Sequence, residues 1–235
     1  VPSQTEFLVD MGLKANIVGI TKFCVHPVEL REEIPVVGGT KQVHMDKIKA
    51  QKPTLIIANK EENTQTMVEE LLEIAPVWVT DMNTIDEALK SLQHLADYLQ
   101  VGDKAKVLFD EVKKEKASFE DFMKDKTWKK VLYFIWKDPY MAAGRATFIN
   151  DFLALNKWEN ILEEETRYPE IHPDTTAKPD LLLLSSEPYP FSGKHQPELE
   201  EDWNRPSILV DGEYFSWYGS RMKEAFKYFR SLHLD

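Results

Sequence analysis

The stretch Asp103–Asp125 limits what this chain can fold into more than any other part of the sequence. It contains neither Gly nor Pro and is rich in Lys, Glu, Ala and Phe. At about 1.5 Å per residue, a helix of this stretch would be ~34 Å long, roughly the width of a small domain. Asp103 is expected as its N-cap. Apolar residues recur at threes, fours and sevens, which predicts one apolar stripe made of Ala105, Leu108, Val112, Phe119 and Met123.

Apolar strands alternate with amphipathic helices both before and after this long helix. Continuous apolar runs that are separated by helices are typical of parallel sheets buried on both faces. We therefore expect an α/β fold with two lobes, each built on a parallel sheet, joined by one long backbone helix. The predicted strands lie at residues 55–58, 77–79, 130–136, 181–184 and 208–210.

A near-repeat supports two similar lobes rather than one larger domain with an ordinary surface helix. Residues 51–57 and 177–183 each place a Lys-Pro break before a buried strand, and a polar loop follows each strand. The expected division is an N-terminal α/β lobe, a backbone helix and a C-terminal α/β lobe, at residues 1–102, 103–126 and 127–235.

The remaining elements rest on shorter patterns. Further strands are expected at residues 15–20 and 36–37. Residues 137–144 and 211–219 are expected to be loops. Further helices are expected at residues 4–13, 46–51, 64–74, 84–99, 147–155 and 220–232.

The composition excludes several classes of partner and site. A net charge of -11 argues against nonspecific nucleic-acid binding and against an anionic membrane surface as partner. The single Cys24 rules out an intrachain disulfide and a cysteine-based zinc or iron–sulfur site. No stretch is long enough to span a bilayer, and no signal peptide is recognisable. The abrupt start at Val1-Pro2-Ser3 leaves a processed N-terminus open.

Aromatic residues gather in the loops that follow the predicted strands. Ligands of open parallel sheets bind at the carboxyl ends of the strands. Several rings that face one cleft would suit a large, flat, partly apolar ligand, although about half of them would instead pack the lobe edges. Arg145 and Arg167 are expected to meet a carboxylate, phosphate or amide of the ligand. The other predicted ligand-binding residues are Phe23, His26, Trp136, Tyr140, Tyr189, Phe191, Trp217 and Tyr218.

No catalytic motif stands out. The chain has no Gly-rich phosphate loop and no Gly-x-Ser-x-Gly elbow, and its Ser and His residues suggest no triad. We therefore predict no enzyme activity, no catalytic residue and no cofactor. One alternative is a binder of bare zinc or manganese ions that uses His26 and His172 together with carboxylates. Two further alternatives are an enzyme acting on a metal-chelate or nucleotide-like substrate and a scaffold that binds only proteins through its aromatic surface.

Carboxylates occupy equivalent places in the two repeats. Glu61 and Glu62 follow the strand at 55–58, and Glu187 follows the strand at 181–184. One exposed carboxylate on each lobe would suit docking onto arginines of a membrane partner, where such contacts mostly set encounter rate and register. A solvated loop charge is the alternative for each of them.

In order and spacing, several short segments resemble the periplasmic substrate-binding proteins of ABC metal-chelate importers. The resemblance is to the type with a helical backbone, which includes the cobalamin binders of vitamin B12 importers and the ferric siderophore binders. It runs nearly end to end through Pro2-Ser3-Gln4-Thr5-Glu6, Gly12-Leu13, Val18-Gly19-Ile20-Thr21, Val37-Gly38-Gly39-Thr40, Ile48, Lys52-Pro53-Thr54-Leu55-Ile56-Ile57-Ala58, Pro139, Gly144-Arg145, Asn160-Ile161, Arg167-Tyr168-Pro169-Glu170 and Lys178-Pro179-Asp180-Leu181.

The resemblance implies a class III periplasmic-binding-protein-like fold, with a ligand held between the lobes and delivered to an ABC permease. It implies a periplasmic or otherwise extracytoplasmic protein, possible lipid anchoring, a monomer, and little hinge motion. In this family a β-strand lies ahead of the segment that matches Pro2-Ser3. The cobalamin binders have Trp where this chain has Asn59, and their two docking glutamates align near Gln65 and Ser216. A cobalamin or other corrinoid is the favoured ligand, with haem and ferric siderophores as alternatives.

Overall fold

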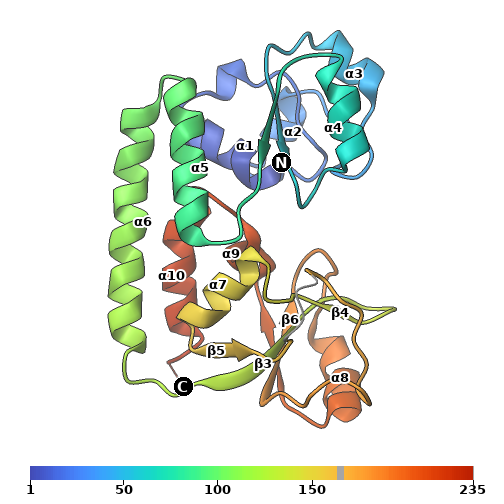
Figure 1. The fold of residues 1–235 in the computed structure, drawn as a ribbon, viewed down its shortest axis with the longest axis vertical. Coiled ribbons are helices and arrows are strands. Elements are labelled where there is room, and N and C mark those ends of the chain that lie inside the picture. Colours follow the sequence, from blue (N-terminus) through green and yellow to red (C-terminus); the bar gives the residue numbers. More distant parts are fainter. Residues whose placement is uncertain (163–166, 235) are drawn as a thin grey trace. The chain divides into compact units, whose positions relative to one another are not determined.

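The computed structural model describes residues 1–162 and 167–234, which form two compact units (Figure 1). Unit 1 consists of Val1–Met82, Asp86–Phe109 and Tyr218–Ser220. Unit 2 consists of the described residues among Asn83–Ile85, Asp110–Trp217 and Arg221–Asp235. The predicted α/β fold with parallel sheets and one long helix is confirmed, and the division at residues 1–102, 103–126 and 127–235 stays a prediction.

Unit 1 is built on a parallel pair of strands, β1 (Ile56–Asn59) and β2 (Val77–Thr80), with Ile56 opposite Val77. The predicted strands at 55–58 and 77–79 are thus correct to within one residue. Helices precede and follow the strands. They are α1 (Pro2–Asp10), α2 (Leu30–Glu33), α3 (Met45–Ala50), α4 (Gln65–Leu72) and α5 (Ile85–Tyr98).

The predicted strand at residues 15–20 is wrong. Lys14–Asn16 form a short 3-10 helix, and beyond it Ile20 makes only a single bridge to Val36. Ala15 and Asn16 are exposed, and Asn competes for backbone hydrogen bonds in a way that favours turns over strands. The apolar run was therefore too short to form a ladder.

Unit 2 contains a larger sheet with the strand order β4-β3-β6-β7, and β5 also pairs with β3. All pairs are parallel except β3 with β4. The strands are β3 (Lys129–Trp136), β4 (Met141–Ala142), β5 (Trp158–Asn160), β6 (Leu181–Ser185) and β7 (Ser207–Val210). The helices are α7 (Phe148–Leu155), α8 (Gln196–Trp203), α9 (Gly212–Ser216) and α10 (Arg221–Ser231).

The sequence reading missed four of these elements. Residues 137–144 were expected to be a loop but contain β4, and residues 211–219 were expected to be a loop but contain α9. β5 and α8 were not predicted at all. These elements have between two and eight residues, too few for a periodic pattern to stand out.

The long helix α6 (Gly102–Met123) contributes residues to both units. The predicted stripe is largely correct, because four of its five residues are buried and Leu108 is partly buried. The N-cap prediction is wrong, since the helix already begins at Gly102 and Asp103 lies in its first turn.

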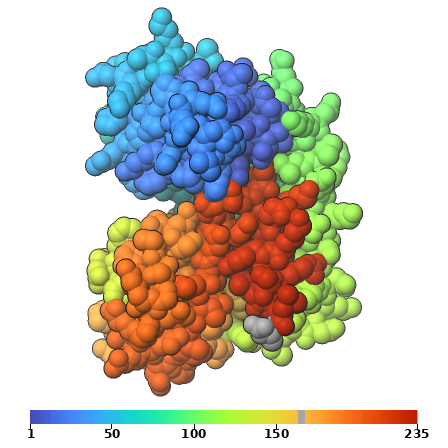
Figure 2. All heavy atoms as spheres, turned by 180° about the vertical axis from the view of Figure 1, so that it is seen from behind, coloured from blue at the N-terminus to red at the C-terminus, as the bar shows by residue number. Residues whose placement is uncertain are grey.

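Within unit 2, α10 packs beside α6, as Figures 1 and 2 show. The ring of Phe119 on α6 lies 5.8 Å from that of Phe226 and 5.9 Å from that of Phe229. Lys223 on α10 also forms an ion pair with Glu111 on α6 at 2.7 Å. In the part of the chain that the structure describes, we find no helix of the length and apolar character that crossing a bilayer requires.

Replacing Thr147 by Ala is expected to lower the free energy of unfolding by about 1–2 kcal/mol. Thr147 is the N-cap of α7: its buried Oγ1 accepts a hydrogen bond from Asn150 N at 3.3 Å and donates one to Gly144 O at 2.7 Å. Urea unfolding measures the effect. The control Thr66→Ala changes an exposed threonine inside α4, and an equal loss in both variants would contradict the capping role.

Candidate functional site

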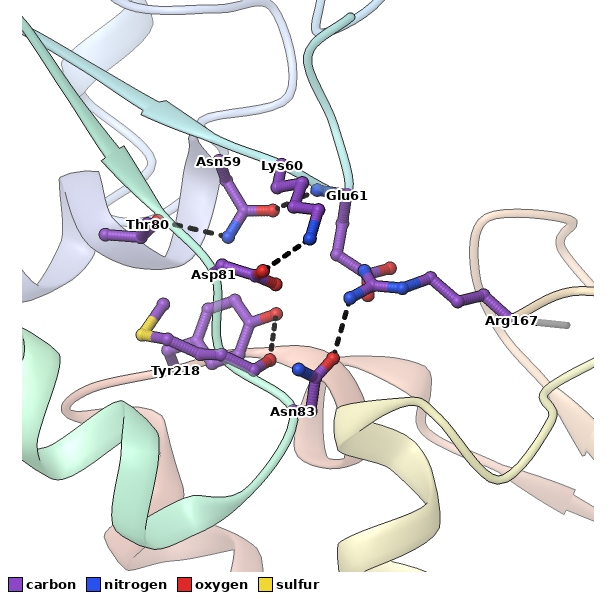
Figure 3. A network of polar contacts seen from close by, with 9 residues as sticks. Asn59, Lys60, Glu61, Thr80, Asp81, Asn83, Arg167 and Tyr218 are labelled. Atoms are coloured by element: carbon purple, nitrogen blue, oxygen red, sulfur yellow. Dashed lines mark hydrogen bonds and ion pairs between the residues drawn. The ribbon is translucent and has the colours of Figure 1, made fainter. Parts of the chain in front are cut away.

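Buried polar side chains fix the loop that follows β1 in unit 1 (Figure 3). Asn59 is fully buried, and its Nδ2 donates to Thr80 Oγ1 at 3.1 Å. Its Oδ1 accepts from Glu61 N at 2.8 Å, while its own backbone N donates to Asn63 Oδ1 at 2.9 Å. Gln4 Nε2 also donates to Thr80 Oγ1, at 2.6 Å. These bonds hold residues 60–63 in one conformation at the carboxyl end of the sheet.

The two glutamates in this loop differ in their surroundings. Glu61 is partly exposed, and its carbonyl accepts a hydrogen bond from Lys41 Nζ at 2.7 Å. Glu62 Oε2 is buried and has no hydrogen-bond partner among the described residues. Burial raises the pKa of the Glu62 carboxyl, against the lowering effect of Lys41. Glu61 is therefore the better placed of the two to meet an outside cation.

Phe23 and His26 lie in the loop after Ile20 in unit 1. The Phe23 side chain is 47% exposed and has Lys22 Nζ 5.0 Å from its ring centroid. His26 is partly buried. Both residues stay predicted ligand contacts of unit 1.

A cavity of about 440 Å³ also lies in unit 1. Ile56, Ile57 and Ala58 of β1 line it, together with Ile17–Thr21 and residues of α1. It runs mainly beside the strand, although Asn63 in the loop after β1 also lines it, whereas ligands of open parallel sheets bind at the carboxyl ends of the strands. We do not assign the ligand to this cavity.

Two aromatic rings, one exposed and one partly buried, lie at the carboxyl end of the unit 2 sheet. Trp136 ends β3 and is 41% exposed, and its ring lies edge-on to that of Tyr189 with centroids 5.7 Å apart. Tyr189 N donates to Ile135 O at 3.2 Å, which ties the loop after β6 to β3. We call Trp136 and Tyr189 the aromatic pair. It offers an apolar surface that is fixed from both strands.

Tyr140 and Lys137 are held by α8 beside the aromatic pair. The Tyr140 hydroxyl donates to Asp202 Oδ2 at 3.1 Å, and Lys137 forms an ion pair with Glu198. Burial, together with the bond to Asp202, raises the pKa of the Tyr140 hydroxyl, so it stays protonated. The ring of the predicted contact residue Tyr140 is therefore partly exposed, while its hydroxyl is already hydrogen-bonded to Asp202.

The predicted arginines flank one backbone segment of unit 2. Gly144 N donates to Arg167 O at 2.8 Å, which brings residue 167 next to the residue that precedes Arg145. Arg145 is exposed, with its Nη2 3.5 Å from Asn160 O. The Arg167 guanidinium donates to Asn83 Oδ1 at 2.8 Å (Figure 3). Both arginines are thus positioned in the same part of the unit.

Three of the predicted aromatic contacts are buried instead. Phe191 is 5% exposed and packs in the core of unit 2. Trp217 is 6% exposed, and Tyr218 is 5% exposed and belongs to unit 1. Their rings have almost no free surface to offer, so the structure does not favour stacking of a ligand on them. Position after a strand was not enough to tell these rings from exposed ones.

Glu187 is engaged within unit 2. Its Oε1 accepts from Ser216 Oγ and from Trp217 Nε1, both at 2.9 Å. Burial raises the pKa of its carboxyl more than these two bonds lower it, and Glu213 and Asp211 raise it further. A negative charge at Glu187 therefore costs free energy in the folded state.

The two histidines of the bare-ion alternative lie in different units. His26 is part of unit 1, while His172 is an exposed residue of unit 2. Among residues 1–162 and 167–234, no group of three or more His, Cys, Asp or Glu residues is arranged to hold a metal ion. The structure gives the bare-ion alternative no specific support.

A family model described as periplasmic binding protein matches residues 1–201. This chain belongs to the periplasmic binding protein family. Its members are substrate-binding transport proteins rather than enzymes, which confirms the prediction of no enzyme activity. The family serves ABC importers and binds small chelate ligands outside the cytoplasm.

Individual relatives are distant but match over nearly the full chain. A vitamin B12-binding protein of Pectobacterium carotovorum subsp. carotovorum is 23% identical over 94% of this chain and 82% of its own length. The vitamin B12-binding protein BtuF of Vibrio cholerae superposes with a TM-score of 0.80 at 18% identity, over 100% of this chain and 96% of that one. The haem-binding protein RhuT of Roseiflexus sp. RS-1 gives 0.82 at 19%, over 99% and 95%. The resemblance read from the sequence is confirmed.

The polar side chains that form hydrogen bonds at the strand ends of this protein were not predicted from the sequence. Asn59 and Thr80 looked like ordinary loop and strand residues. Asp211 caps α9 by accepting a hydrogen bond from Glu213 N at 3.1 Å. This cap could have been predicted, because Asp before Gly-Glu is a typical helix start.

Replacing Asn59 by Ala is expected to lower the free energy of unfolding by about 1–3 kcal/mol, because Glu61 N and Thr80 Oγ1 each lose a buried partner. Amide exchange at residues 60–63 should also become faster. Chemical denaturation and hydrogen exchange measure the two effects. Gln65→Ala, a change at an exposed residue next to this loop, is the control. Unchanged exchange at residues 60–63 would contradict the role of Asn59.

A Glu187→Gln variant is expected to be at least as stable as the unchanged protein at pH 7. The pKa of this carboxyl is raised on folding, so its contribution to stability is present at low pH and is lost as pH rises through the folded pKa. Glutamine still offers an acceptor oxygen and carries no charge. The unchanged protein should therefore gain stability relative to the variant as pH falls from 7. Urea unfolding at several pH values tests this, and a gap between the two that is independent of pH would contradict it.

Proposed function

We propose that this chain binds a metal chelate, with cobalamin or another corrinoid favoured, and delivers it to an ABC permease. The observation that carries the proposal is the aromatic pair at the carboxyl end of the unit 2 sheet, in which the Trp136 ring is 41% exposed. A flat macrocycle has the area and apolar character to rest against such rings. Phe23 and His26 of unit 1 and Tyr140 of unit 2 are proposed as further contacts.

Arg145 and Arg167 supply the polar part of the proposed site. A guanidinium presents several N–H donors in a fixed fork, which suits a carboxylate, a phosphate or an amide oxygen. Arg145 is exposed and Arg167 is partly exposed. Corrinoids carry amides and a phosphate, and haem carries carboxylates. The two arginines therefore support a chelate with polar side groups, while the names of the vitamin B12-binding relatives favour the corrinoid.

Haem is the second candidate ligand. The fold superposes on the haem-binding RhuT as well as on BtuF. Asn59 stands where the resemblance to cobalamin binders implies Trp, and it is buried in a hydrogen-bond network. One aromatic contact of a cobalamin binder is therefore absent from this position, and this supports keeping haem and ferric siderophores as alternatives.

Replacing Trp136 by Ala is expected to weaken binding of cobalamin at least tenfold, because the larger ring of the aromatic pair is lost. Quenching of tryptophan fluorescence and calorimetry measure the dissociation constant. Trp128→Ala is the matched control, since Trp128 is 56% exposed and precedes β3 rather than following it. Equal affinity of the two variants would contradict the proposed site.

We propose Glu61, Glu62 and Glu187 as the residues that dock onto the permease. Glu61 and Glu187 follow β1 and β6 at equivalent places of the two units. The charge on Glu187 costs folding free energy although a glutamine would satisfy the same two donors, which supports a task for that charge outside the fold. A monomeric carrier, either free or lipid-anchored, belongs to the same proposal.

Charge removal by Glu61→Gln is expected to lower transport at least several-fold while ligand affinity stays unchanged, since rim charges mainly set encounter rate. Uptake of labelled ligand by permease in proteoliposomes, with this chain added, measures transport. Glu32→Gln, at an exposed residue of α2, is the control. Equal transport rates for both variants would remove Glu61 from the docking surface.

A further inference from the structure

The chain leaves unit 2 after Trp217, contributes three residues to unit 1 and returns at Arg221. Within unit 1, the Tyr218 hydroxyl donates to Met82 O at 3.4 Å. Gly219 has a φ of +85°, and a Cβ there would lie 2.9 Å from Phe7 Cβ. The segment Tyr218–Ser220 is therefore closely packed in a conformation that suits only glycine at its centre.

The residues at the two ends of this segment hold each other inside unit 2. The Arg221 guanidinium lies 5.0 Å from the ring centroid of Trp217. Arg221 Nη1 also pairs with Glu213 Oε2 at 2.9 Å, and these two side chains are only 14% and 20% exposed. A cation held over an indole face and paired with a carboxylate in a largely buried place is a comparatively strong contact.

Glu187 connects the loop after β6 to the same place. Its Oε1 accepts from Trp217 Nε1 and Ser216 Oγ at 2.9 Å each. Gly212 allows this close approach, because a Cβ there would lie 2.6 Å from Glu187 Cγ and 2.4 Å from Ser185 Oγ. We call Glu187, Glu213, Trp217 and Arg221 the clamp.

The Trp217 ring is fixed on both its polar edge and its face. Its N–H binds Glu187 and its face is covered by Arg221, which leaves it 6% exposed. The ring therefore has no surface for a ligand. Instead, the ring fixes the point at which the chain leaves unit 2. Trp217 directly follows α9, which itself begins two residues after the carboxyl end of β7.

We propose that Glu187 is a positioning residue that acts through Trp217 to fix the ends of the segment Tyr218–Ser220, and that ligand affinity depends on this clamp. The part on ligand affinity rests on the proposed function. Neither Glu187 nor Trp217 has to touch the ligand for the effect, because Glu187 lies in the loop after β6 only two residues before Tyr189 of the aromatic pair.

The first test uses amide hydrogen exchange of Tyr218–Ser220 in the ligand-free protein. Glu187→Ala is expected to speed exchange there about tenfold or more, because Trp217 Nε1 and Ser216 Oγ lose a buried acceptor. Glu187→Gln keeps an acceptor oxygen and should restore slow exchange. Glu224→Ala, a loss of an exposed carboxylate on α10, is the matched control and should change nothing.

A second measurement tests whether Glu187 acts through Trp217. Trp217→Phe removes the indole N–H that binds Glu187 and keeps an aromatic ring. This variant can therefore test the contact even if Glu187→Ala fails to fold. The double variant should exchange about as fast as the faster single variant, since both remove the same contact. Two results would overturn the clamp. One is that the increases in exchange rate of the two single variants multiply in the double variant. The other is that exchange at Tyr218–Ser220 stays slow in a folded Glu187→Ala variant.

Cobalamin titration of the same variants separates the clamp from the proposed function. The expected result is a dissociation constant raised at least severalfold in Glu187→Ala and Trp217→Phe, with recovery in Glu187→Gln. Faster exchange without any change in affinity would overturn the link between clamp and binding. If the unchanged protein binds neither cobalamin nor haem, the proposed function fails, and the exchange data alone then decide on the clamp.

Discussion

Both units depend on hydrogen bonds at the edge where their parallel strands end. Buried polar groups at such an edge must find hydrogen-bond partners inside the protein. In unit 1, Asn59 and Thr80 bind each other and the turn of the following loop. In unit 2, buried Ser185 accepts from the Tyr133 hydroxyl at 3.0 Å and donates to Glu187 O at 2.6 Å. These bonds fix the loops in which the proposed contacts lie.

Contacts at the strand ends of unit 2 explain why its sheet edge can present aromatic rings without exposing the core. Trp136 and Tyr189 are tied to β3 and to the loop after β6, so their surface is available at little further entropic cost when a ligand binds. Phe191 packs in the core below them, and Trp217 serves the clamp. Rings of one predicted group thus differ in their surroundings, although each of them follows a strand.

The fold was predictable from the sequence because the long, uninterrupted pattern of α6 and the continuous apolar strands leave few alternatives. The site was predictable only by region. Position after a strand selected Trp136, whose ring is exposed, and Phe191, whose ring is buried, without distinguishing them, because burial depends on packing against α8, which was not predicted. Asn59 was passed over for the same reason: its partner Thr80 lies on another strand, and only the parallel register brings them together.

Calorimetric titration of the unchanged chain with cobalamin, beside haem, a ferric siderophore and free Zn²⁺, tests the central claim most directly. We predict saturable one-to-one binding of cobalamin, or else of one of the other two chelates, with a dissociation constant below about 1 μM, equivalent to roughly 8 kcal/mol. Tight binding of Zn²⁺ with no binding of any chelate would contradict the account.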